Sequence, residues 1–247
     1  MNYKEELYKK YVSTHILPRK GSLTLAQLQE RANAYQKQFG KFLPTEKNTK
    51  IIDLGCGNGS IVWWLQQKGF TNSYGIDISA DYIKMGQSLG IKNLEKAEIK
   101  EFLKDKINFY DVIFARDIFE HFNKDEILEV LSLCLSSLKD NGRMILQVPN
   151  ATSPFFGSIR YGDFTHEIAF TISSISQILN FVGFSDIEFY PVYRPVGSLK
   201  SIIRYLLWKV VESFYQFLLS VEIGKGKRIV TQNILVIAFK KSEAKDE

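Results

Sequence analysis

The sequence is poor in cysteine and in long apolar stretches. Cys56 and Cys134 are the only cysteines among 247 residues, which excludes a disulfide framework and a structural zinc site built on cysteine pairs. No apolar run approaches the ~18–20 residues that cross a bilayer. The first ten residues are charged and lack the apolar core of a signal peptide. We therefore expect a cytoplasmic protein without a transmembrane segment.

The excess of positive charge lies at one end of the chain. Residues 1–50 hold ten Lys or Arg against four Asp or Glu, whereas residues 51–247 hold 22 against 23. A nucleic-acid-binding protein more often carries a basic stripe with interleaved aromatic residues on its folded body. We therefore predict no nucleic-acid partner. We interpret residues 1–45 as a solvated, helical N-terminal arm and residues 46–247 as the folded domain.

Short apolar segments alternate with amphipathic ones along most of the chain. The patterns predict strands at 51–52, 73–78, 94–99, 111–115, 143–148, 184–190 and 231–240. They predict helices at 24–42, 61–68, 81–89, 125–138, 174–180 and 198–221, with a turn at Asn141 and Gly142. This alternation is typical of an α/β, doubly wound, mostly parallel sheet with helices on both faces.

A glycine-rich segment, Asp53-Leu54-Gly55-Cys56-Gly57-Asn58-Gly59, lies between the first strand and the next helix. Open α/β sheets bind nucleotides at such turns. Glycine lets the backbone turn tightly and approach a ligand closely, and the following helix N-terminus offers free N–H groups. The spacing is GxGxG rather than the GxGxxG of dinucleotide folds, and the Gly-Lys-Ser/Thr ending of an ATP-binding P-loop is missing.

Two acidic residues follow at the ends of the next two strands. Asp77 ends the second strand, where a carboxylate can accept hydrogen bonds from both hydroxyls of a ribose. Glu98 lies near the end of the third strand, where an adenine amino group would lie. The glycine segment and these two acids, taken in order, predict a nucleoside-containing cofactor.

The segments DLGCGNGS, YGIDIS, KAEIKEFL, YDVIFARDIFEHF and LKDNGRMILQVPN resemble the class I S-adenosylmethionine-dependent methyltransferases over about residues 50–150. The resemblance implies a Rossmann-like, seven-stranded sheet whose last strand is antiparallel. It implies S-adenosyl-L-methionine as the cofactor and S-adenosyl-L-homocysteine as the product. It assigns cofactor contacts to Asp53, Gly55, Cys56, Gly57, Asn58, Gly59, Asp77, Ile78, Glu98, Ile99 and Arg116.

Two histidines are candidates for the acceptor side, because a hydroxyl acceptor must lose a proton to a general base. His121 follows the fourth strand, and we expect Asp117, four residues earlier, to share a helix face with it. His166 lies in a long loop over residues 150–172, which we interpret as the acceptor loop. We favour His166 as the base, oriented by the neighbouring Asp163 and Glu167, with His121 as its rival.

The sequence around His166, RYGDFTHE, resembles a subset of methyltransferases in bacterial surface-polysaccharide (capsule or O-antigen) biosynthesis. This resemblance implies O-methylation of a sugar or a glycan-linked group. A polyol suits several polar side chains, and we expect acceptor contacts from Arg160, Tyr161, Thr165 and Glu167. We predict no metal, with a site at Asp163, His166 and Glu167 as the alternative. Two other functions stay open: methylation of a small molecule (a quinone or secondary metabolite), and cofactor binding without catalysis.

The predicted helix over 198–221 carries a wide apolar stripe. We interpret it as a helix packed on the core or on a second subunit, which would make a homodimer. The alternative is peripheral contact with a membrane. We favour packing because basic residues are sparse and glutamates interrupt the polar face.

Overall fold

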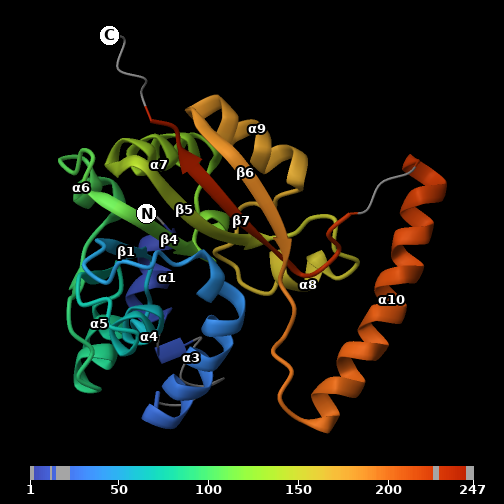
Figure 1. Ribbon diagram of the computed structural model, residues 1–247, viewed down its shortest axis with the longest axis horizontal. Coiled ribbons are helices and arrows are strands. Elements are labelled where there is room, and N and C mark those ends of the chain that lie inside the picture. The colour runs from blue at the N-terminus through green and yellow to red at the C-terminus, as the bar shows by residue number, and fades with distance from the viewer. Residues whose placement is uncertain (1–2, 12, 15–22, 225–227, 243–247) are drawn as a thin grey trace.

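The computed structural model describes residues 3–11, 13–14, 23–224 and 228–242. Its strands are β1 (Ile51–Leu54), β2 (Ser73–Asp77), β3 (Leu94–Lys96), β4 (Tyr110–Arg116), β5 (Leu138–Pro149), β6 (Phe184–Pro191) and β7 (Asn233–Lys240). They form one sheet in the order β3-β2-β1-β4-β5-β7-β6 (Figure 1). β7 runs antiparallel to both β5 and β6, whereas β1 to β5 pair in parallel. The predicted doubly wound, seven-stranded sheet with an antiparallel last strand is therefore confirmed.

Helices cover both faces of this sheet (Figure 1). They are α1 (Tyr3–Tyr11), α3 (Leu25–Phe39), α4 (Ser60–Gln67), α5 (Ala80–Ser88), α6 (Ile99–Leu103), α7 (Lys124–Ser137), α8 (Phe156–Arg160), α9 (Ile172–Val182) and α10 (Leu199–Ile223). Two 3-10 turns, η2 (Gly40–Phe42) and η3 (Phe119–His121), complete the described elements. The helices predicted at 24–42, 61–68, 81–89, 125–138, 174–180 and 198–221 are all present, with ends shifted by a few residues.

Alternate residues of β4 point into opposite hydrophobic layers. Ile113 packs in the layer that α7 and α9 cover, whereas Val112 and Phe114 pack in the layer of α3 and α4. Successive side chains of a strand face opposite sides of the sheet, so an almost wholly apolar strand is what a sheet covered on both faces requires.

Helix α3 belongs to this core and is not a solvated arm. Thr24 begins the helix with a capping box to Gln27, and its buried face consists of Leu28, Ala32, Tyr35 and Phe39. The ring of Phe39 lies 5.6 Å from that of Phe114 on the sheet. The interpretation of residues 1–45 as solvated is therefore wrong for this helix, because its apolar period faces the sheet.

Two local predictions fail for identifiable reasons. Residues Asn141 and Gly142 do not form a turn between elements: Asn141 has φ of 60° within β5, whose pairing with β4 shifts register, so the strand absorbs the irregularity. The strand predicted at 94–99 ends at Lys96, because the Glu98 carboxylate accepts a hydrogen bond from the Glu101 N–H (2.9 Å) and caps α6.

Helix α10 projects from the body of the molecule (Figure 1), and few of its residues are buried. Ser201 and Glu212 are its buried residues, and the Glu212 carboxylate accepts a hydrogen bond from the Tyr193 hydroxyl (3.0 Å). The prediction that its apolar stripe packs on the core is wrong, because the large apolar residues of the stripe are exposed. Among the described residues, no helix is both long and apolar enough to cross a bilayer.

Candidate active site

A cleft of about 1030 Å³ opens where the chain leaves β1, β2 and β4. The central strand β1 lies between β2 and β4, and the connections from β1 and β4 leave the sheet on opposite faces. Such a switch point is where open α/β sheets bind ligands. Every predicted cofactor residue except Gly59 lines this cleft: Asp53, Gly55, Cys56, Gly57, Asn58, Asp77, Ile78, Glu98, Ile99 and Arg116.

The three loop glycines have different tasks. Gly55, Gly57 and Gly59 all have positive φ, at 66°, 55° and 75°. A Cβ at Gly55 or Gly59 would lie within 3 Å of the side chain of Ile118 or Leu94, so these two glycines allow close packing. A Cβ at Gly57 would meet nothing within 4 Å and would enter the cleft. Gly57 therefore leaves the backbone open to a ligand.

The Asp77 carboxylate is held in place by two backbone groups. Its Oδ2 accepts from the Gly57 N–H (2.8 Å) and its Oδ1 from the Ser79 N–H (2.8 Å). Burial raises the pKa of Asp77, and these two hydrogen bonds oppose the rise. A carboxylate has about four acceptor positions, so two remain for ribose hydroxyls. The geometry fits the predicted role.

Asp53 is a buried acid at the base of the cleft, with 2% of its surface exposed. Burial raises the pKa of Asp53 to about 8, while the Arg116 guanidinium acts in the opposite direction. A cationic ligand group in the cleft would favour the ionised carboxylate. S-adenosylmethionine carries an ammonium and a sulfonium, so the residue fits that cofactor.

Three polar residues from separate segments meet beside Arg116. The Asp117 Oδ1 accepts from Gln147 Nε2 (2.7 Å) and from Asn233 Nδ2 (3.2 Å). Asp117 has φ of 54°, and the 3-10 turn η3 begins only at Phe119. The expectation that Asp117 and His121 share a helix face is therefore wrong. Sequence patterns missed Gln147 and Asn233 because they reach the cleft from β5 and β7.

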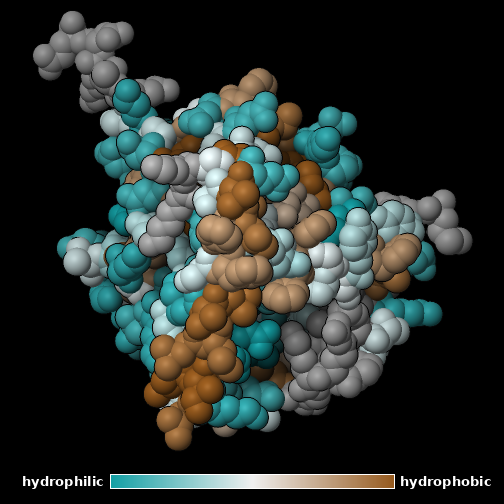
Figure 2. Space-filling model, turned by 90° about the vertical axis from the view of Figure 1, so that its right-hand side faces the viewer, coloured by the Kyte–Doolittle hydropathy of each residue, from teal (hydrophilic) through white to brown (hydrophobic). Residues whose placement is uncertain are grey.

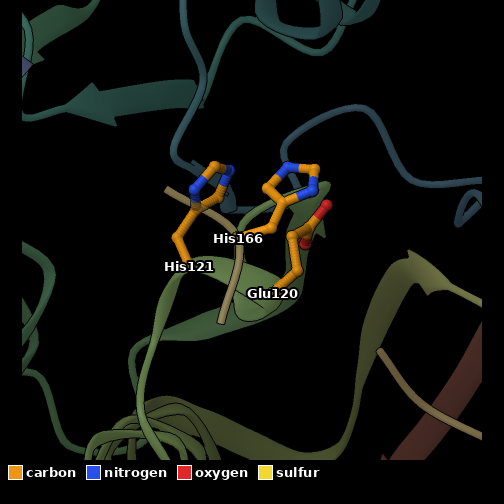
Figure 3. A group of neighbouring side chains, drawn as sticks. All are labelled: Glu120, His121 and His166. Atoms are coloured by element: carbon orange, nitrogen blue, oxygen red, sulfur yellow. The ribbon is translucent and has the colours of Figure 1, made fainter. Parts of the chain in front are cut away.

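His121 borders the cleft, and His166 packs behind it (Figure 3). The two rings lie edge to face with centroids 4.7 Å apart. The Nδ1 of His121 lies 2.9 Å from the Thr165 hydroxyl, and the Nδ1 of His166 lies 2.8 Å from the Ile159 carbonyl oxygen. Burial lowers the pKa of His121 to about 4, so its imidazole is neutral near pH 7.

The predicted acceptor residues of the RYGDFTHE segment mostly bind one another. The Asp163 carboxylate accepts from the Thr165 hydroxyl (2.7 Å), and Arg160 donates to the carbonyl oxygens of His166 and Glu167. Among the described residues, none between 160 and 167 lines the cleft. Asp163 therefore orients His121 through Thr165, rather than His166 as expected.

Two other predicted residues of this segment, Tyr161 and Glu167, do not line the cleft. The Glu167 carboxylate binds Tyr3 and Lys4, the latter at 3.1 Å, and Tyr161 is 76% exposed. The alternative metal set of Asp163, His166 and Glu167 is therefore not brought together. The acceptor roles of Arg160, Tyr161, Thr165 and Glu167 stay predictions.

Helix α1 covers the acceptor end of the cleft. Lys4 donates from Nζ to the carbonyl oxygen of His121 (2.7 Å), and the Tyr8 ring lies 6.2 Å from the His121 ring. Lys4 and Tyr8 both line the cleft, and burial raises the pKa of Tyr8. Sequence analysis missed these residues, because a short helix rich in lysine and glutamate resembles a solvated one.

Comparison with known proteins decides the family. A family model described as a methyltransferase domain matches residues 26–188. The chain belongs to this methyltransferase-domain family. With the ordered cleft residues, this identifies an S-adenosylmethionine-dependent methyltransferase, and it confirms the predicted enzyme class and cofactor.

Curated relatives of this methyltransferase match it over part of their length. The chain is 36% identical over 110 residues to a ubiquinone biosynthesis O-methyltransferase of Pelagibacter ubique, covering 43% of this chain and 44% of that protein. It is 22% identical over 137 residues to a phosphoethanolamine N-methyltransferase of Plasmodium falciparum, covering 53% and 50%. The methyltransferase thus spans about half the length of these relatives.

Solved structures share the fold. A SAM-dependent methyltransferase from Archaeoglobus fulgidus aligns with a TM-score of 0.64 and 23% identity, over 88% of this chain and 100% of that one. Phosphoethanolamine N-methyltransferase 2 of Haemonchus contortus, in complex with S-adenosyl-L-methionine, aligns with a TM-score of 0.60 and 15% identity, over 95% and 60%.

Proposed function

We propose that this methyltransferase transfers the methyl group of S-adenosylmethionine to an oxygen of a small-molecule acceptor. The observation that carries the proposal is the composition of the cleft. Its lining includes His121 and Tyr8 but no residue from 160 to 167, whose polar groups bind one another instead. A site built to bind a sugar would present several of those groups to the acceptor.

The curated relatives support a small acceptor rather than a polysaccharide precursor. Those that match are named for ubiquinone biosynthesis or for phosphoethanolamine. None of these names concerns capsule or O-antigen synthesis, so the expected link to surface polysaccharides has no support from them. The names of these relatives support the alternative interpretation, a small-molecule methyltransferase, better than they support a polysaccharide methyltransferase.

Methyl transfer from a sulfonium is an in-line displacement with an activated leaving group, so alignment supplies much of the acceleration. An acceptor hydroxyl must in addition lose its proton. His121 lies where this proton leaves. Its Nδ1 bonds the Thr165 hydroxyl, which leaves Nε2 for the acceptor oxygen. Tyr8 and Lys4 of α1 close this end and keep water out.

Three sets of acceptors separate the candidate functions. Labelled methyl transfer from S-adenosylmethionine should be measured with small phenols and catechols, with phosphoethanolamine, and with nucleotide sugars. We expect turnover with a phenolic hydroxyl that falls about 10²–10⁴-fold in His121→Ala, at nearly unchanged cofactor affinity. Turnover confined to nucleotide sugars would contradict the proposal, and turnover confined to the amine would contradict its oxygen acceptor.

A further inference from the structure

Three side chains of the metal-ligand type converge behind the acceptor end of the cleft. Glu120 and His121 come from η3 and His166 from the loop after α8 (Figure 3). One ligand atom from each of the three lies within 4.8 Å of the others, and this is the one such group among the described residues.

Hydrogen bonds hold both imidazoles in the tautomer that a metal ligand requires. A carbonyl oxygen can only accept, so the Nδ1 of His166, 2.8 Å from the Ile159 oxygen, carries its hydrogen. The Thr165 hydroxyl donates to Asp163 (2.7 Å), so it accepts from the Nδ1–H of His121. Each neutral ring therefore keeps a lone pair on Nε2. Such outer hydrogen bonds orient metal-binding histidines.

Glu120 supplies an independent observation. The residue is 2% exposed, and its Oε2 is buried with no hydrogen-bond partner. A buried polar atom without a partner is uncommon in folded proteins and points to a missing ion or water. A cation between Glu120 and the two imidazoles would compensate the carboxylate.

We propose that Glu120, His121 and His166 bind one divalent transition-metal cation of the Zn²⁺ type. Two imidazoles and a carboxylate suit Zn²⁺ or Co²⁺, whereas Mg²⁺ prefers oxygen ligands. Three protein ligands leave a coordination position open, and His121 borders the cleft. The use of that position rests on the proposed function and changes one of its steps: Nε2 of His121 then ligates the cation instead of accepting the proton. The cation binds the acceptor hydroxyl, whose proton passes to solvent before the methyl group is transferred.

Metal binding is tested first without any acceptor. The chelator-treated full chain is titrated with Zn²⁺ by calorimetry and with Co²⁺ by visible absorption. We expect one cation per chain and an intense Co²⁺ spectrum of four-coordinate type. Glu120→Gln and His166→Ala should each weaken Zn²⁺ affinity about 100-fold or more, beyond the effect of losing an outer-shell partner. Glu167→Gln, a carboxylate of the same loop that binds Lys4, is the matched control and should keep the affinity.

Circular dichroism and cofactor binding establish that each variant is folded. No stoichiometric binding in the unmodified chain, or binding that Glu120→Gln and His166→Ala leave unchanged, overturns the site. A site that binds Zn²⁺ while the chelated enzyme keeps full turnover overturns the role of the cation in catalysis and leaves the proposed function intact. If the Zn²⁺-loaded enzyme transfers no methyl group to any of the acceptors, the result contradicts the proposed function rather than the metal site.

The exposed face of α10 carries a second inference, independent of the first. Twelve large apolar side chains of this helix are exposed: Leu199, Ile202, Ile203, Leu206, Leu207, Val210, Val211, Phe214, Phe217, Leu218, Val221 and Ile223. Figure 2 shows them as a continuous apolar band. At ~100° per residue this band covers about half of the helix circumference, which is wider than the seam of a two-helix coiled coil.

The charge around this band is positive. Among the described residues of this region, five Lys or Arg stand against two Glu: Arg194, Lys200, Arg204, Lys209 and Arg228 against Glu212 and Glu222. In helical projection Lys200 and Arg204 lie along one edge of the apolar band, which also carries Glu222. Glu212, one of the two acids, lies on the buried side and pairs with Lys209. A wide apolar face with a basic border complements an anionic lipid surface.

The band also continues toward the active site. Phe155 packs against Trp208 of α10 with the two rings tilted by 45° and their centroids 6.2 Å apart. A cavity of about 260 Å³ lies between them and the segment before α10. Val192, Tyr193, Arg194 and Gln232 line both this cavity and the cofactor cleft. An apolar acceptor held in the bilayer would thus lie close to the cleft.

We infer that α10 lies in the surface of an anionic bilayer. The purified chain should float with vesicles of phosphatidylcholine and phosphatidylglycerol and about tenfold less with phosphatidylcholine alone. Leu207→Asp with Phe214→Asp should abolish flotation, whereas Leu25→Asp, an exposed leucine of α3, should not. The unmodified chain could instead fail to float and form a dimer in solution that these α10 substitutions dissociate. That result would overturn the bilayer and show that a second copy of the chain covers α10. Flotation unchanged by them would overturn the role of α10.

Discussion

The ring of His166 lies edge to face against the ring of His121, with 4.7 Å between centroids. His121 borders the cleft and His166 supports it from the acceptor loop. We therefore expect the two histidines to act as one unit, although the sequence presented them as rivals. Both lie beside the buried Glu120, so the three side chains form one cluster behind the acceptor end of the cleft.

Replacement of either histidine should lower turnover, because both belong to this one cluster of side chains. We expect His166→Ala to lose ~10²–10⁴-fold in turnover and His121→Ala at least as much, because His121 borders the cleft. Cofactor affinity should stay nearly unchanged in both, since Asp53 and Asp77 are intact. Full turnover in His166→Ala with a loss in His121→Ala would remove His166 from the mechanism. Full turnover in both variants would exclude the whole cluster from the mechanism.

Replacement of Asp77 by Ala should weaken cofactor binding while the fold persists. The change removes hydrogen bonds to the ribose, each worth about 1.5–3 kcal/mol at most when one partner is charged. It also frees the Gly57 and Ser79 N–H groups that the carboxylate now binds. Calorimetric titration with S-adenosylmethionine measures the effect. Equal affinity in the variant and the unmodified chain would show that Asp77 does not bind the ribose.

Gly57→Val should abolish cofactor binding, because the new side chain would enter the cleft from a backbone with φ of 55°. Gly90→Val is a matched control: Gly90 also has positive φ, 79°, and open space around its missing Cβ, but it does not line the cleft. Both variants should lose stability through backbone strain. Only Gly57→Val should lose the cofactor, and binding in that variant would contradict the loop assignment.

Asp53 should make the stability of the cofactor-free protein fall as the pH rises. Burial raises the pKa of Asp53 to about 8, so the native state binds a proton between about pH 4 and pH 8 that the unfolded state has released. The free energy of unfolding therefore decreases over this window, and Asp53→Asn should remove that part of the slope. Urea unfolding at several pH values measures both slopes. Identical slopes would show that Asp53 is ionised throughout.

The same residue predicts the opposite trend for cofactor affinity. A cationic cofactor favours ionised Asp53, so the affinity for S-adenosylmethionine should rise from pH 6 to about pH 8. The increase should disappear in Asp53→Asn. Near pH 8 this variant should bind S-adenosylmethionine more weakly than the unmodified chain does. Calorimetry in buffers of different ionisation enthalpy should detect one released proton. An affinity that falls with pH in the unmodified chain would contradict this electrostatic account.

The cofactor half of the site could be predicted from sequence because each part is local. The glycine segment, Asp77 and Glu98 each follow a strand, and parallel strands bring their carboxyl ends to one edge. Gly59 is the exception: its positive φ and its approach to Leu94 serve packing, and it does not line the cleft. The motif therefore shows that a residue must be glycine, but not whether that glycine contacts the ligand or packs against a neighbouring side chain.

The acceptor half could not be predicted in this way, because it depends on contacts between distant segments. Lys4 donates to the His121 carbonyl oxygen although the two residues are 117 positions apart in the sequence, and Asn233 donates to Asp117 from the last strand. The buried state of Glu120 follows from the packing of η3 beneath the acceptor loop, whose N–H groups at residues 167 and 168 bind the Glu120 carbonyl oxygen. None of these relations leaves a periodic pattern in the sequence.

Helix α10 shows a different limit. Its apolar period was predicted, but a helical period indicates only that one face avoids water. The structure turns Ser201 and Glu212 toward the body and leaves the apolar face outward. What covers that face depends on partners that a single chain does not contain.

Calorimetric titration of the full chain with S-adenosylmethionine tests the central claim most directly. The account predicts one binding site per chain that Gly57→Val abolishes, Asp77→Ala weakens and Gly90→Val leaves unchanged. Absence of binding in the unmodified chain, or binding that Gly57→Val and Asp77→Ala both leave unchanged, would contradict the assignment of this cleft to the cofactor.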